Sequence, residues 1–449
     1  MYLDFIFKVF DKFQDKDALT WNGTVYSYSS LINNIKRSEL FCNKNNIKPG
    51  MSVAIIGDFS PNSIAVLFAL IEKQCIIVPL TRSSQKRHDQ LFKIAQVETV
   101  ITIDEKDTIS VELISDIKQN NYYDQLRTNK HPGLVLFTSG TSGQPKAAVH
   151  DFLSLLEKFK TKKRALRTIN FLLFDHWGGL NTMFHILSNG GLVITTKNRS
   201  PEEVCKLIET YKIELLPASP TFLNLLLLSS AHNNHTMTSL KIISYGTEPM
   251  PQSTLKRLKT IFPDVKLLQT YGLIELGVMQ SKSESDDSLW VKVGGEGYKT
   301  RIVNDILQIK ADSAMLGYLN APSPFTDDGW FITGDRVLQK DGYIKILGRD
   351  SEIINVGGEK VYPQEVENIV LEMEDVIDVV VFGEKNALMG EIVSARIVVK
   401  NNELDTKLLT RDIKKYCKSK LDSFKIPMKF DFTTDLQYGS RFKKRRADN

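Results

Sequence analysis

Short runs of β-branched and other apolar residues recur along the chain, separated by stretches with helical periodicity. Residues 62–73 and 202–211 carry apolar side chains at helical spacing, and Pro201 followed by two glutamates is typical of a helix start. This alternation predicts an α/β protein with mainly parallel sheets. The four clearest strand-like runs are residues 52–57, 75–80, 133–138 and 191–195.

The length of the chain implies more than one domain. It has 449 residues, and single hydrophobic cores stop growing at roughly 250–300 residues. After about residue 360 the pattern becomes a helix at 363–372, strands at 377–382 and 391–399, and a helix at 404–419. A unit with this order and about 100 residues is typical of a small α+β domain.

The composition excludes several classes of protein. Hydrophobic residues make up 42% of the chain and charged residues 25%, which is close to the average for globular proteins and argues against a disordered or fibrous chain. The net charge of +5 is small for this length, so nucleic-acid binding is not indicated. Much of that charge comes from Lys443, Lys444, Arg445 and Arg446.

The cysteines and the apolar segments bear on the location of the protein. The four cysteines show no spacing typical of zinc sites, disulfide frameworks or thioredoxin-like motifs, which fits a reducing cytoplasm. Charged residues interrupt the N-terminal stretch, and no run approaches the ~20 apolar residues of a membrane-spanning helix. We therefore expect a cytoplasmic protein that is neither secreted nor integral to a membrane.

The densest functional pattern is residues 137–146, Phe-Thr-Ser-Gly-Thr-Ser-Gly-Gln-Pro-Lys, directly after a strand-like run. Its glycines let backbone N–H groups converge on an anion, its hydroxyls add donors, and Lys146 adds a positive charge, so it predicts a phosphate-binding loop. It is not a Walker loop, because Pro145 stands at the second glycine position and Ala147 follows the lysine. By composition alone, a flexible Ser/Gly surface loop is the alternative.

Five motifs in this chain resemble, in the same order, those of the adenylate-forming superfamily of acyl-CoA synthetases, nonribosomal-peptide adenylation domains and luciferases. The resemblance covers most of the chain. It implies a large N-terminal domain of mainly parallel sheets sandwiched with helices, over residues 1–349, and a small C-terminal α+β domain that rotates, over residues 350–449. The motifs are the phosphate loop at 137–146, a strand and turn at 240–251, Gln-Thr-Tyr-Gly-Leu-Ile-Glu at 269–275, Gly-Trp-Phe-Ile-Thr-Gly-Asp at 329–335, and a linking segment at 348–367.

The resemblance also implies sites for ATP and Mg²⁺. Tyr271 offers a ring for the adenine, Glu275 is an oxygen ligand of the kind that Mg²⁺ prefers, and Lys146 would contact the phosphates. Asp335 would accept hydrogen bonds from the ribose diol, with Arg349 as a nearby donor. The expected nucleotide-binding residues are Thr138, Ser139, Gly140, Thr141, Ser142, Gly143, Gly246, Thr247, Glu248, Pro249, Thr270, Tyr271, Gly272, Asp335 and Arg349.

The chain departs from the family at three places. Lys443 aligns with the family's catalytic lysine, which bridges the carboxylate and the α-phosphate during adenylation, but the Pro, Thr and Gly of the surrounding pattern are replaced. Lys444 or Arg441 could take its role, and a plain basic tail is the alternative. Ile274 stands where the family usually has a threonine near the phosphates, and Ser351 stands at the expected hinge between the domains.

The segment 174–180 lies where the family lines its acyl pocket. In amino-acid adenylating enzymes an aspartate there meets the substrate's ammonium group, whereas in acyl- and aryl-CoA ligases it would orient the loop. We favour the second interpretation. The expected pocket residues are Asp175, His176, Trp177, Ser219 and Gly246.

The predicted reaction is activation of a carboxylic acid, a small-molecule substrate, by ATP to acyl-AMP with release of pyrophosphate, followed by transfer to a thiol. The thiol belongs to CoA or to the phosphopantetheine of an acyl carrier protein, and Gly357, Gly358 and Lys360 are expected to line its tunnel. An amino-acid adenylating enzyme is the alternative within the family. A non-catalytic nucleotide- or acyl-binding relative is the alternative suggested by Ile274 and the altered C-terminal motif.

Overall fold

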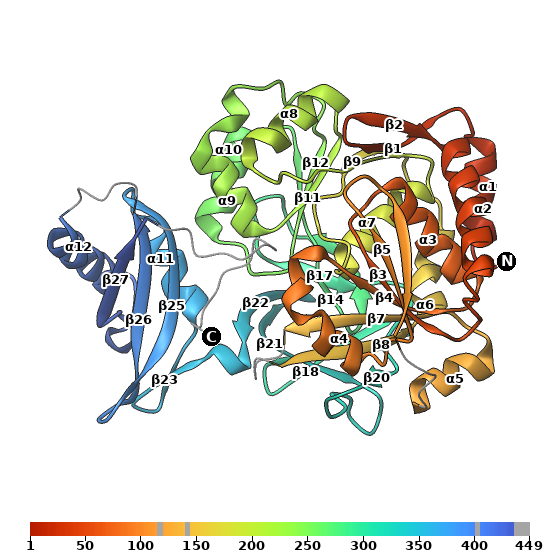
Figure 1. Cartoon of the computed structure of the whole chain (residues 1–449). Coiled ribbons are helices and arrows are strands. Elements are labelled where there is room, and N and C mark those ends of the chain that lie inside the picture. The colour runs from red at the N-terminus through yellow and green to blue at the C-terminus, as the bar shows by residue number, and fades with distance from the viewer. Residues whose placement is uncertain (115–119, 140–143, 400–404, 435–449) are drawn as a thin grey trace.

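The computed structural model describes residues 1–114, 120–139, 144–399 and 405–434. These residues form a large N-terminal domain and a small C-terminal domain, which lies at the left of Figure 1. The two predicted domains are therefore present. The boundary at residue 349 stays a prediction.

The first sheet of the N-terminal domain is parallel except at one edge. Its strands pair in the order β13-β12-β11-β9-β10-β1-β2, and within it only β1 and β2 run antiparallel. The strand predicted at 191–195 is confirmed and corresponds to β10. The bounds are β13 (Lys266–Gln269), β12 (Ile242–Tyr245), β11 (Leu215–Ala218), β9 (Arg167–Ile169), β10 (Leu192–Ile194), β1 (Asp17–Trp21) and β2 (Thr24–Ser27).

The second sheet has a parallel centre and antiparallel edges. Its order is β20-β8-β7-β4-β3-β5-β6, in which β7, β4, β3 and β5 are parallel. The other three predicted strands are β3, β4 and β7. The bounds are β20 (Gly317–Tyr318), β8 (Pro145–Asp151), β7 (Gly133–Ser139), β4 (Ile76–Leu80), β3 (Ser52–Ile56), β5 (Thr99–Ile103) and β6 (Ile109–Leu113).

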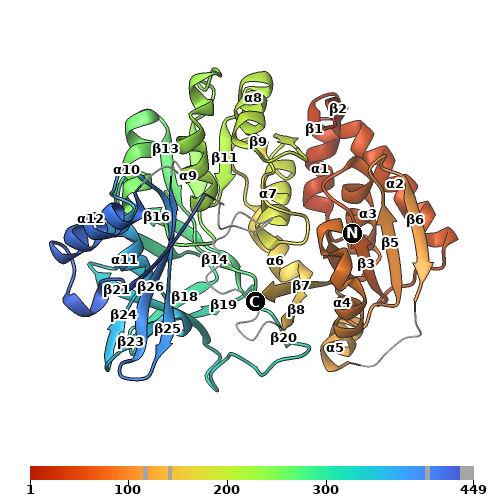
Figure 2. The ribbon, with the colours of Figure 1, turned by 60° about the vertical axis from the view of Figure 1, so that its left-hand side comes forward.

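One hydrophobic core joins these two sheets. It contains Leu19 from the first sheet, Val53 from the second, and most of α3 (Pro61–Glu72) and α7 (Trp177–Leu187). Because α3 is apolar on nearly all sides, it is buried on nearly all sides. In Figure 2, α7 lies between the group of α1, α2 and α3 and the group of α8, α9 and α10. The rings of Phe68 and Phe184 stack at 5.4 Å and link α3 to α7.

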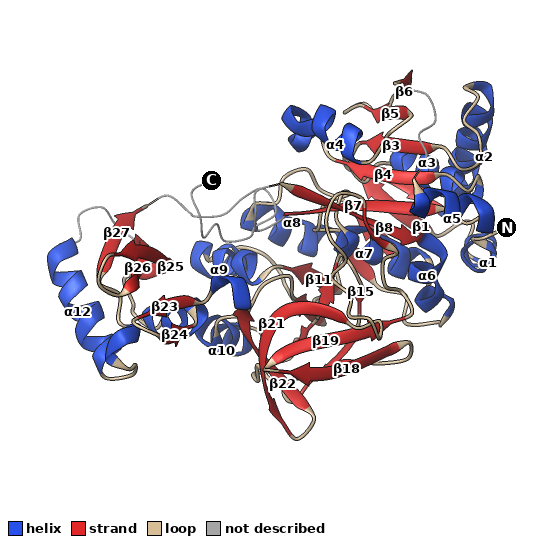
Figure 3. Ribbon diagram, turned by 90° about the horizontal axis from the view of Figure 1, so that it is seen from below, coloured by secondary structure: helices blue, strands red, loops and turns tan. Residues whose placement is uncertain are grey.

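A third sheet of the N-terminal domain is wholly antiparallel, a feature that the strand–helix alternation did not predict (Figure 3). Two of its hairpins close through two-residue turns, Asn304–Asp305 and Asp341–Gly342, in which both residues have positive φ. Such turns match the right-handed twist of antiparallel strands. In sheet order its strands are β16 (Gln280–Ser283), β17 (Val291–Gly294), β22 (Tyr343–Arg349), β21 (Phe331–Lys340), β19 (Ile306–Ala311) and β18 (Tyr298–Val303); β14 (Gly272–Leu273) and β15 (Gly277–Val278) form a separate ribbon.

The C-terminal domain has its own core, formed by a five-stranded sheet and two helices. The predicted order of helix, strand, strand and helix is confirmed by α11 (Pro363–Val370), β25 (Val376–Asn386), β26 (Gly390–Val399) and α12 (Thr406–Lys418). β27 (Lys429–Thr433) pairs parallel to β26. The remaining strands are β23 (Ile354–Val356) and β24 (Glu359–Val361).

The other helices pack against the sheets and against one another through buried apolar residues, and several begin at a clear N-cap. The hydroxyl of Ser200 accepts from the backbone N–H of Glu203, so α8 begins at the predicted Pro201. The bounds are α1 (Asp4–Lys12), α2 (Tyr28–Lys44), α4 (His88–Ile94), α5 (Asn121–Asn129), α6 (Phe152–Leu156), α8 (Pro201–Tyr211), α9 (Pro220–Ser229) and α10 (Gln252–Ile261), with 3-10 turns η1 (Arg82–Arg87), η2 (Glu157–Lys160), η3 (Ala231–Asn233), η4 (Asp350–Glu352) and η5 (Ser423–Lys425).

Candidate functional site

Three neighbouring parallel strands, β11, β12 and β13, end at the same edge of the first sheet. The residues that follow them are Ser219, Gly246 and Thr270. Ligands of open α/β sheets bind outside the carboxyl ends of the strands. The structure therefore brings together residues that the sequence assigned to the nucleotide and to the acyl pocket.

Gly246 and Thr270 approach each other too closely for any larger residue at position 246. A Cβ atom added to Gly246 would lie 2.5 Å from Thr270 Oγ1 and 2.6 Å from its carbonyl oxygen. The same threonine donates its backbone N–H to the carbonyl of Tyr245 at 2.7 Å and its hydroxyl to that carbonyl at 3.0 Å. Residue 246 therefore packs directly against Thr270, and this position has room only for glycine.

The turn after Gly246 is tied to the start of α9. Glu248 Oε1 accepts from the backbone N–H of Thr221 at 2.8 Å, and the hydroxyl of Ser219 accepts from the N–H of Phe222 at 3.1 Å. Both acceptors satisfy N–H groups in the first turn of the helix. Thr247 is exposed with a φ of +73°, and Pro249 is half-buried.

The predicted phosphate loop is the connection of a β-hairpin. β7 ends at Ser139, β8 begins at Pro145, and Thr138 pairs with Lys146 across the two strands. Gly140, Thr141, Ser142 and Gly143 lie outside the described residues. The side chain of Gln144 accepts a hydrogen bond from Gln90 on α4 at 2.6 Å.

A network of two buried side chains, Tyr271 and Asp335, and the exposed Arg349 joins the Tyr-Gly motif to the third sheet. Tyr271 donates its hydroxyl to Asp335 Oδ2 at 2.5 Å, and Arg349 Nε lies 2.7 Å from Asp335 Oδ1. Asp335 and Arg349 are directly opposite on β21 and β22. Arg349 also donates to the carbonyl of Thr333 at 2.8 Å. Three residues that the sequence assigned to adenine and ribose therefore meet.

Burial controls the protonation of this network. Burial raises the pKa of Asp335, an effect that the charge of Arg349 and the hydroxyl of Tyr271 oppose. Burial and the neighbouring Asp335 carboxylate raise the pKa of Tyr271 well above its ordinary value. The phenol of Tyr271 therefore stays a hydrogen-bond donor at neutral pH.

A second network holds the residues assigned to phosphate and metal. Tyr318 on β20 donates its hydroxyl to Glu275 Oε1 at 2.6 Å. The ring centroid of Tyr318 lies 5.5 Å from Lys146 Nζ. Ile274, the departure from the family's threonine, is partly buried and packs against apolar residues. Gly272, half-buried in the β14–β15 ribbon, stands between the two networks in the chain.

The expected acyl-pocket segment forms the start of α7. Asp175 is buried, and its Oδ2 accepts from the hydroxyl of Thr81 at 3.4 Å. His176 caps the helix, because its Nδ1 accepts from the N–H of Gly178 at 3.0 Å. The structure places the Trp177 ring in the core, 1% exposed and 6.3 Å from the Phe152 ring. A pocket role for Trp177 stays a prediction.

The expected thiol tunnel lies in the C-terminal domain. Gly357 and Gly358 form the turn between β23 and β24 with φ values of +59° and +94°. Both glycines and Lys360 are exposed. Ser351 lies within η4, next to Asp350, whose Oδ1 is 2.6 Å from Arg336 Nε. Lys443, with Arg441 and Lys444, lies outside the described residues.

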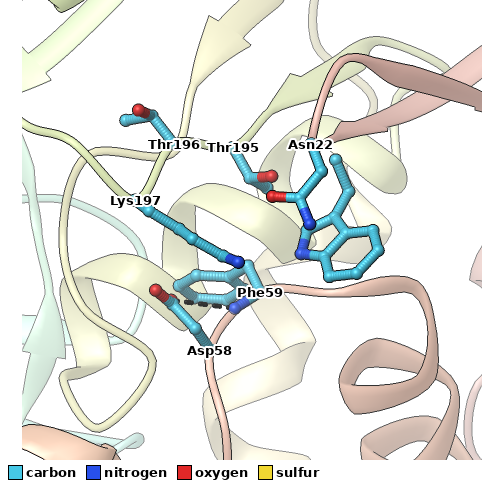
Figure 4. Close-up of a pocket in the computed structure, with 7 residues that line it drawn as sticks. Asn22, Asp58, Phe59, Thr195, Thr196 and Lys197 are labelled. Atoms are coloured by element: carbon cyan, nitrogen blue, oxygen red, sulfur yellow. Dashed lines mark hydrogen bonds between the residues drawn. The ribbon is translucent and has the colours of Figure 1, made fainter. Parts of the chain in front are cut away.

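A small cavity opens elsewhere, between the β1–β2 turn and the loops after β3 and β10 (Figure 4). Its volume of about 30 Å³ is room for a few water molecules at most. It cannot hold a nucleotide. Its lining residues are Trp21, Asn22, Asp58, Phe59, Thr195, Thr196 and Lys197, none of which the sequence assigned to a site.

Some contacts of the site were not predicted from the sequence. Tyr318, Asn320 and Thr333 bind predicted site residues or their neighbours, and Thr81 binds Asp175. Thr333 lies within the recognised motif at 329–335, and the available signal for Tyr318 and Asn320 was Gly-Tyr-Leu-Asn at 317–320, between two recognised motifs. Within the described residues, no group of three or more His, Cys, Asp or Glu side chains could hold a metal ion. No described helix is long and apolar enough to cross a membrane.

Two similar proteins are CoA ligases. It is 23% identical to the long-chain-fatty-acid–CoA ligase of Bacillus subtilis, over 95% of this chain and 90% of the relative. It is 26% identical to the 2-succinylbenzoate–CoA ligase of Listeria innocua, over 93% of this chain and 92% of the relative.

Solved structures show the same fold. The anthranilate CoA ligase AuaEII in complex with anthranoyl-AMP superposes with a TM-score of 0.84 at 18% identity, over 99% of this chain and 95% of that one. ATP-bound MatB from Rhodopseudomonas palustris superposes with a TM-score of 0.78 at 22% identity, over 98% and 97%.

Two family models match the chain in the predicted order. The model of the AMP-binding enzyme matches residues 6–305, and that of the AMP-binding enzyme C-terminal domain matches residues 365–443. The first match alone spans more than half of the chain. The chain therefore belongs to the family of AMP-binding enzymes.

Proposed function

We propose that this protein is an acid–thiol ligase that activates a carboxylic acid with ATP and transfers the acyl group to CoA. In the first step, a carboxylate oxygen forms a bond to the α-phosphorus of ATP and the bond from that phosphorus to the bridging oxygen breaks, which releases pyrophosphate. In the second step, the thiol sulfur bonds to the acyl carbon, AMP leaves, and the thiol proton passes to solvent.

The contact of Asp335 with both Tyr271 and Arg349 is the observation that carries this proposal. A carboxylate buried beside a phenol and a guanidinium can accept from the two ribose hydroxyls, because each carboxylate oxygen has more than one acceptor site. Lys146 lies on β8 of the adjoining second sheet. We assign the ribose to Asp335 and the phosphates to Lys146 and the hairpin.

The described residues fit a magnesium ion that is bound mainly by the nucleotide. Mg²⁺ typically takes one or two carboxylates and completes its shell with phosphate oxygens and water. Glu275 supplies a carboxylate whose Oε1 is bonded to Tyr318, which leaves Oε2 for a metal. When bound, Mg²⁺ would neutralise charge on the phosphates. We propose Glu275 as its protein ligand.

We assign the acyl group to the edge of the first sheet near Ser219 and Gly246, with Asp175 as a residue that orients the loop. The hydrogen bond from Thr81 to Asp175 supports this role, because it engages the Asp175 carboxylate with another residue of the protein. An amino-acid substrate would instead require Asp175 to face the substrate's ammonium group. His176 caps the N-terminus of α7, so its proposed contribution to the acyl site is to fix the start of that helix.

We propose Lys443 as the residue that offsets repulsion between the carboxylate and the α-phosphate during the first step. Two anions must approach each other there, and a cation between them lowers the barrier. Gly357, Gly358 and Lys360 would line the thiol path after the C-terminal domain rotates. CoA is the proposed acceptor, with carrier-protein phosphopantetheine as the alternative. The four cysteines are free and buried, which supports a reducing cytoplasm.

Pyrophosphate exchange tests the proposal. The purified protein is incubated with ATP, Mg²⁺, labelled pyrophosphate and a panel of aliphatic, aromatic and amino acids, and CoA is added in a second stage. Acid-dependent exchange followed by thioester formation is the expected result. Tight ATP binding without exchange for any acid would indicate the non-catalytic relative. Exchange confined to amino acids would reverse the assignment of Asp175.

A further inference from the structure

The segment 315–320, which lies outside the recognised motifs, contacts both side chains assigned to the phosphates and the metal. Part of it is β20, which extends the second sheet beside β8. The backbone N–H of Leu319 donates to the carbonyl of Ala147 at 2.9 Å. The segment is therefore attached to the strand that carries Lys146.

Asn320 holds the peptide groups on both sides of Lys146. Its Oδ1 accepts from the backbone N–H of Ala147 at 3.0 Å, and its Nδ2 donates to the carbonyl of Pro145 at 2.8 Å. A planar side-chain amide that bonds two successive peptide groups restricts the backbone between them. This arrangement fixes the direction in which the Lys146 side chain leaves β8.

Tyr318 contacts the charged groups themselves. The residue is 9% exposed, its hydroxyl donates to Glu275 at 2.6 Å, and its ring centroid lies 5.5 Å from Lys146 Nζ. Within the part of the chain that the structure describes, Glu275 and Lys146 form no ion pair with each other. The phenol therefore satisfies each charge separately, by a charge-assisted hydrogen bond and by a cation–π contact.

We infer that Tyr318 is a positioning residue of the nucleotide site, which aims Glu275 at the metal and Lys146 at the phosphates and keeps the two from pairing with each other. The inference rests on the proposed function. A direct ion pair would occupy both groups before ATP arrives, whereas the phenol leaves Glu275 Oε2 and the lysine N–H groups available. Asn320 supports the same geometry through its side-chain hydrogen bonds to the backbone on either side of Lys146.

ATP binding, measured by calorimetry as a function of Mg²⁺ concentration, tests this inference without the need for turnover. Tyr318→Phe keeps the ring and loses the hydroxyl, so the Mg²⁺-dependent gain in ATP affinity should fall about tenfold, while affinity without Mg²⁺ stays near that of the wild type. Tyr318→Leu also loses the cation–π contact and should weaken ATP binding without Mg²⁺ severalfold.

Tyr298→Phe is the matched control. Its phenol is also partly buried and forms hydrogen bonds to Ser313 Oγ at 2.8 Å and to the carbonyl of Leu276, the residue after Glu275, at 3.4 Å. None of these hydrogen bonds involves the side chain of Glu275 or Lys146. Its loss should leave the Mg²⁺ dependence unchanged. A lower melting temperature in Tyr318→Phe with wild-type Mg²⁺ dependence would show a merely structural role and overturn the inference.

A double-mutant cycle with Glu275→Gln separates positioning from stability. If Tyr318 acts through the Glu275 carboxylate, Tyr318→Phe should cause little further loss of Mg²⁺ dependence in the Glu275→Gln background. Additive losses would contradict that route. If the wild-type protein binds no ATP, both the proposed function and this inference are overturned. If the wild type binds ATP and Tyr318→Phe shows the same Mg²⁺ dependence of ATP affinity, the inference alone is overturned.

Discussion

The proposed nucleotide site of the N-terminal domain and the proposed thiol turn of the C-terminal domain are built in opposite ways. Asp335 is 6% exposed, and both of its carboxylate oxygens are bonded to side chains of the same domain. Gly357 and Gly358 are exposed, and the backbone N–H of Gly357 donates to the carbonyl of Met389 in its own small domain. Asp335 is therefore held inside the N-terminal domain, whereas the proposed thiol turn lies on the surface of the C-terminal domain.

This difference indicates how the two halves of the reaction divide between the domains. The side chains of the Asp335 network all belong to the N-terminal domain, so under the proposed function both half-reactions would use it whatever the orientation of the C-terminal domain. The exposed turn at Gly357 and Gly358 would contribute only in an orientation that brings it to the acyl-adenylate. Asn224 Nδ2 on α9 donates to the carbonyl of Ile377 at 3.0 Å, so the present orientation includes a hydrogen bond between the domains.

Asp335→Ala should cause the largest loss, about a hundredfold or more in both half-reactions. The change removes the acceptor for the ribose and leaves Tyr271 and Arg349 without their buried partner, which corresponds to roughly 3 kcal/mol or more. Pyrophosphate exchange measures the first half-reaction, and consumption of supplied acyl-adenylate with CoA measures the second. Asp328→Ala is the control, because its carboxylate pairs with Arg301 on the exposed face of the same sheet. A loss confined to the thiol step would refute the ribose assignment.

Lys443→Ala should slow acyl-AMP formation by about a hundredfold, roughly 2.7 kcal/mol, because the cation acts while the carboxylate approaches the α-phosphate. Thioester formation from supplied acyl-adenylate should stay near normal, since the C-terminal segment would then have moved away. Both half-reactions are measured as above, with Lys444→Ala and Arg441→Ala as comparisons. Equal loss in the two would indicate a folding defect, and an effect only in a neighbouring variant would move the role there.

Gly357→Val should slow the thiol step about tenfold and leave adenylation near the wild-type rate. The residue has a φ of +59°, and an added Cβ would lie 2.9 Å from the flexible end of Met389. A β-branched residue is strained in that conformation by roughly 1–2 kcal/mol. Gly23→Val is the control, because Gly23 has a φ of +78° and open space around it in the N-terminal domain. If both half-reactions fall equally in Gly357→Val, the turn has no specific part in thiol transfer.

His150→Leu should have the smallest effect, limited to acid stability of the N-terminal domain. Burial lowers the pKa of His150 to about 4, so between pH 6.5 and 4 the unfolded state binds the proton more strongly and stability falls as the pH falls. The residues from 350 to 449 contain no histidine. Thermal unfolding at pH 7 and pH 5 should show a loss of a few degrees in the wild type that is smaller in the variant.

His235→Leu provides the control of opposite sign. Hydrogen bonds to Glu209 and Glu202, at 3.0 and 2.8 Å, raise the pKa of His235. Its contribution to stability is therefore present below its unfolded pKa and is lost as the pH rises through the raised value. This variant should lose more stability at pH 5 than at pH 7. The same pH response in both variants would contradict the assignment of the His150 effect to burial.

Much of the fold follows from local patterns in the chain. The apolar runs at β3, β4, β7 and β10 are fully or largely buried strands, and Pro201 after Ser200 begins α8 as its capping chemistry requires. The antiparallel sheet was missed because its strands are half-exposed and lack long apolar runs. Its hairpin turns at Asn304–Asp305 and Asp341–Gly342 carried the available signal.

By itself, the sequence determined the order of the motifs, the family and the residue types that serve the nucleotide, because glycine turns, helix caps and strand runs depend on neighbouring residues. Only the tertiary structure decided which side chains meet. Tyr271 bonds Asp335 across 64 residues, and Tyr318 bonds Glu275 across 43. These contacts depend on the register and crossing of strands that pair far apart in the chain, and a difference of one residue in register would turn a side chain to the opposite face of its sheet.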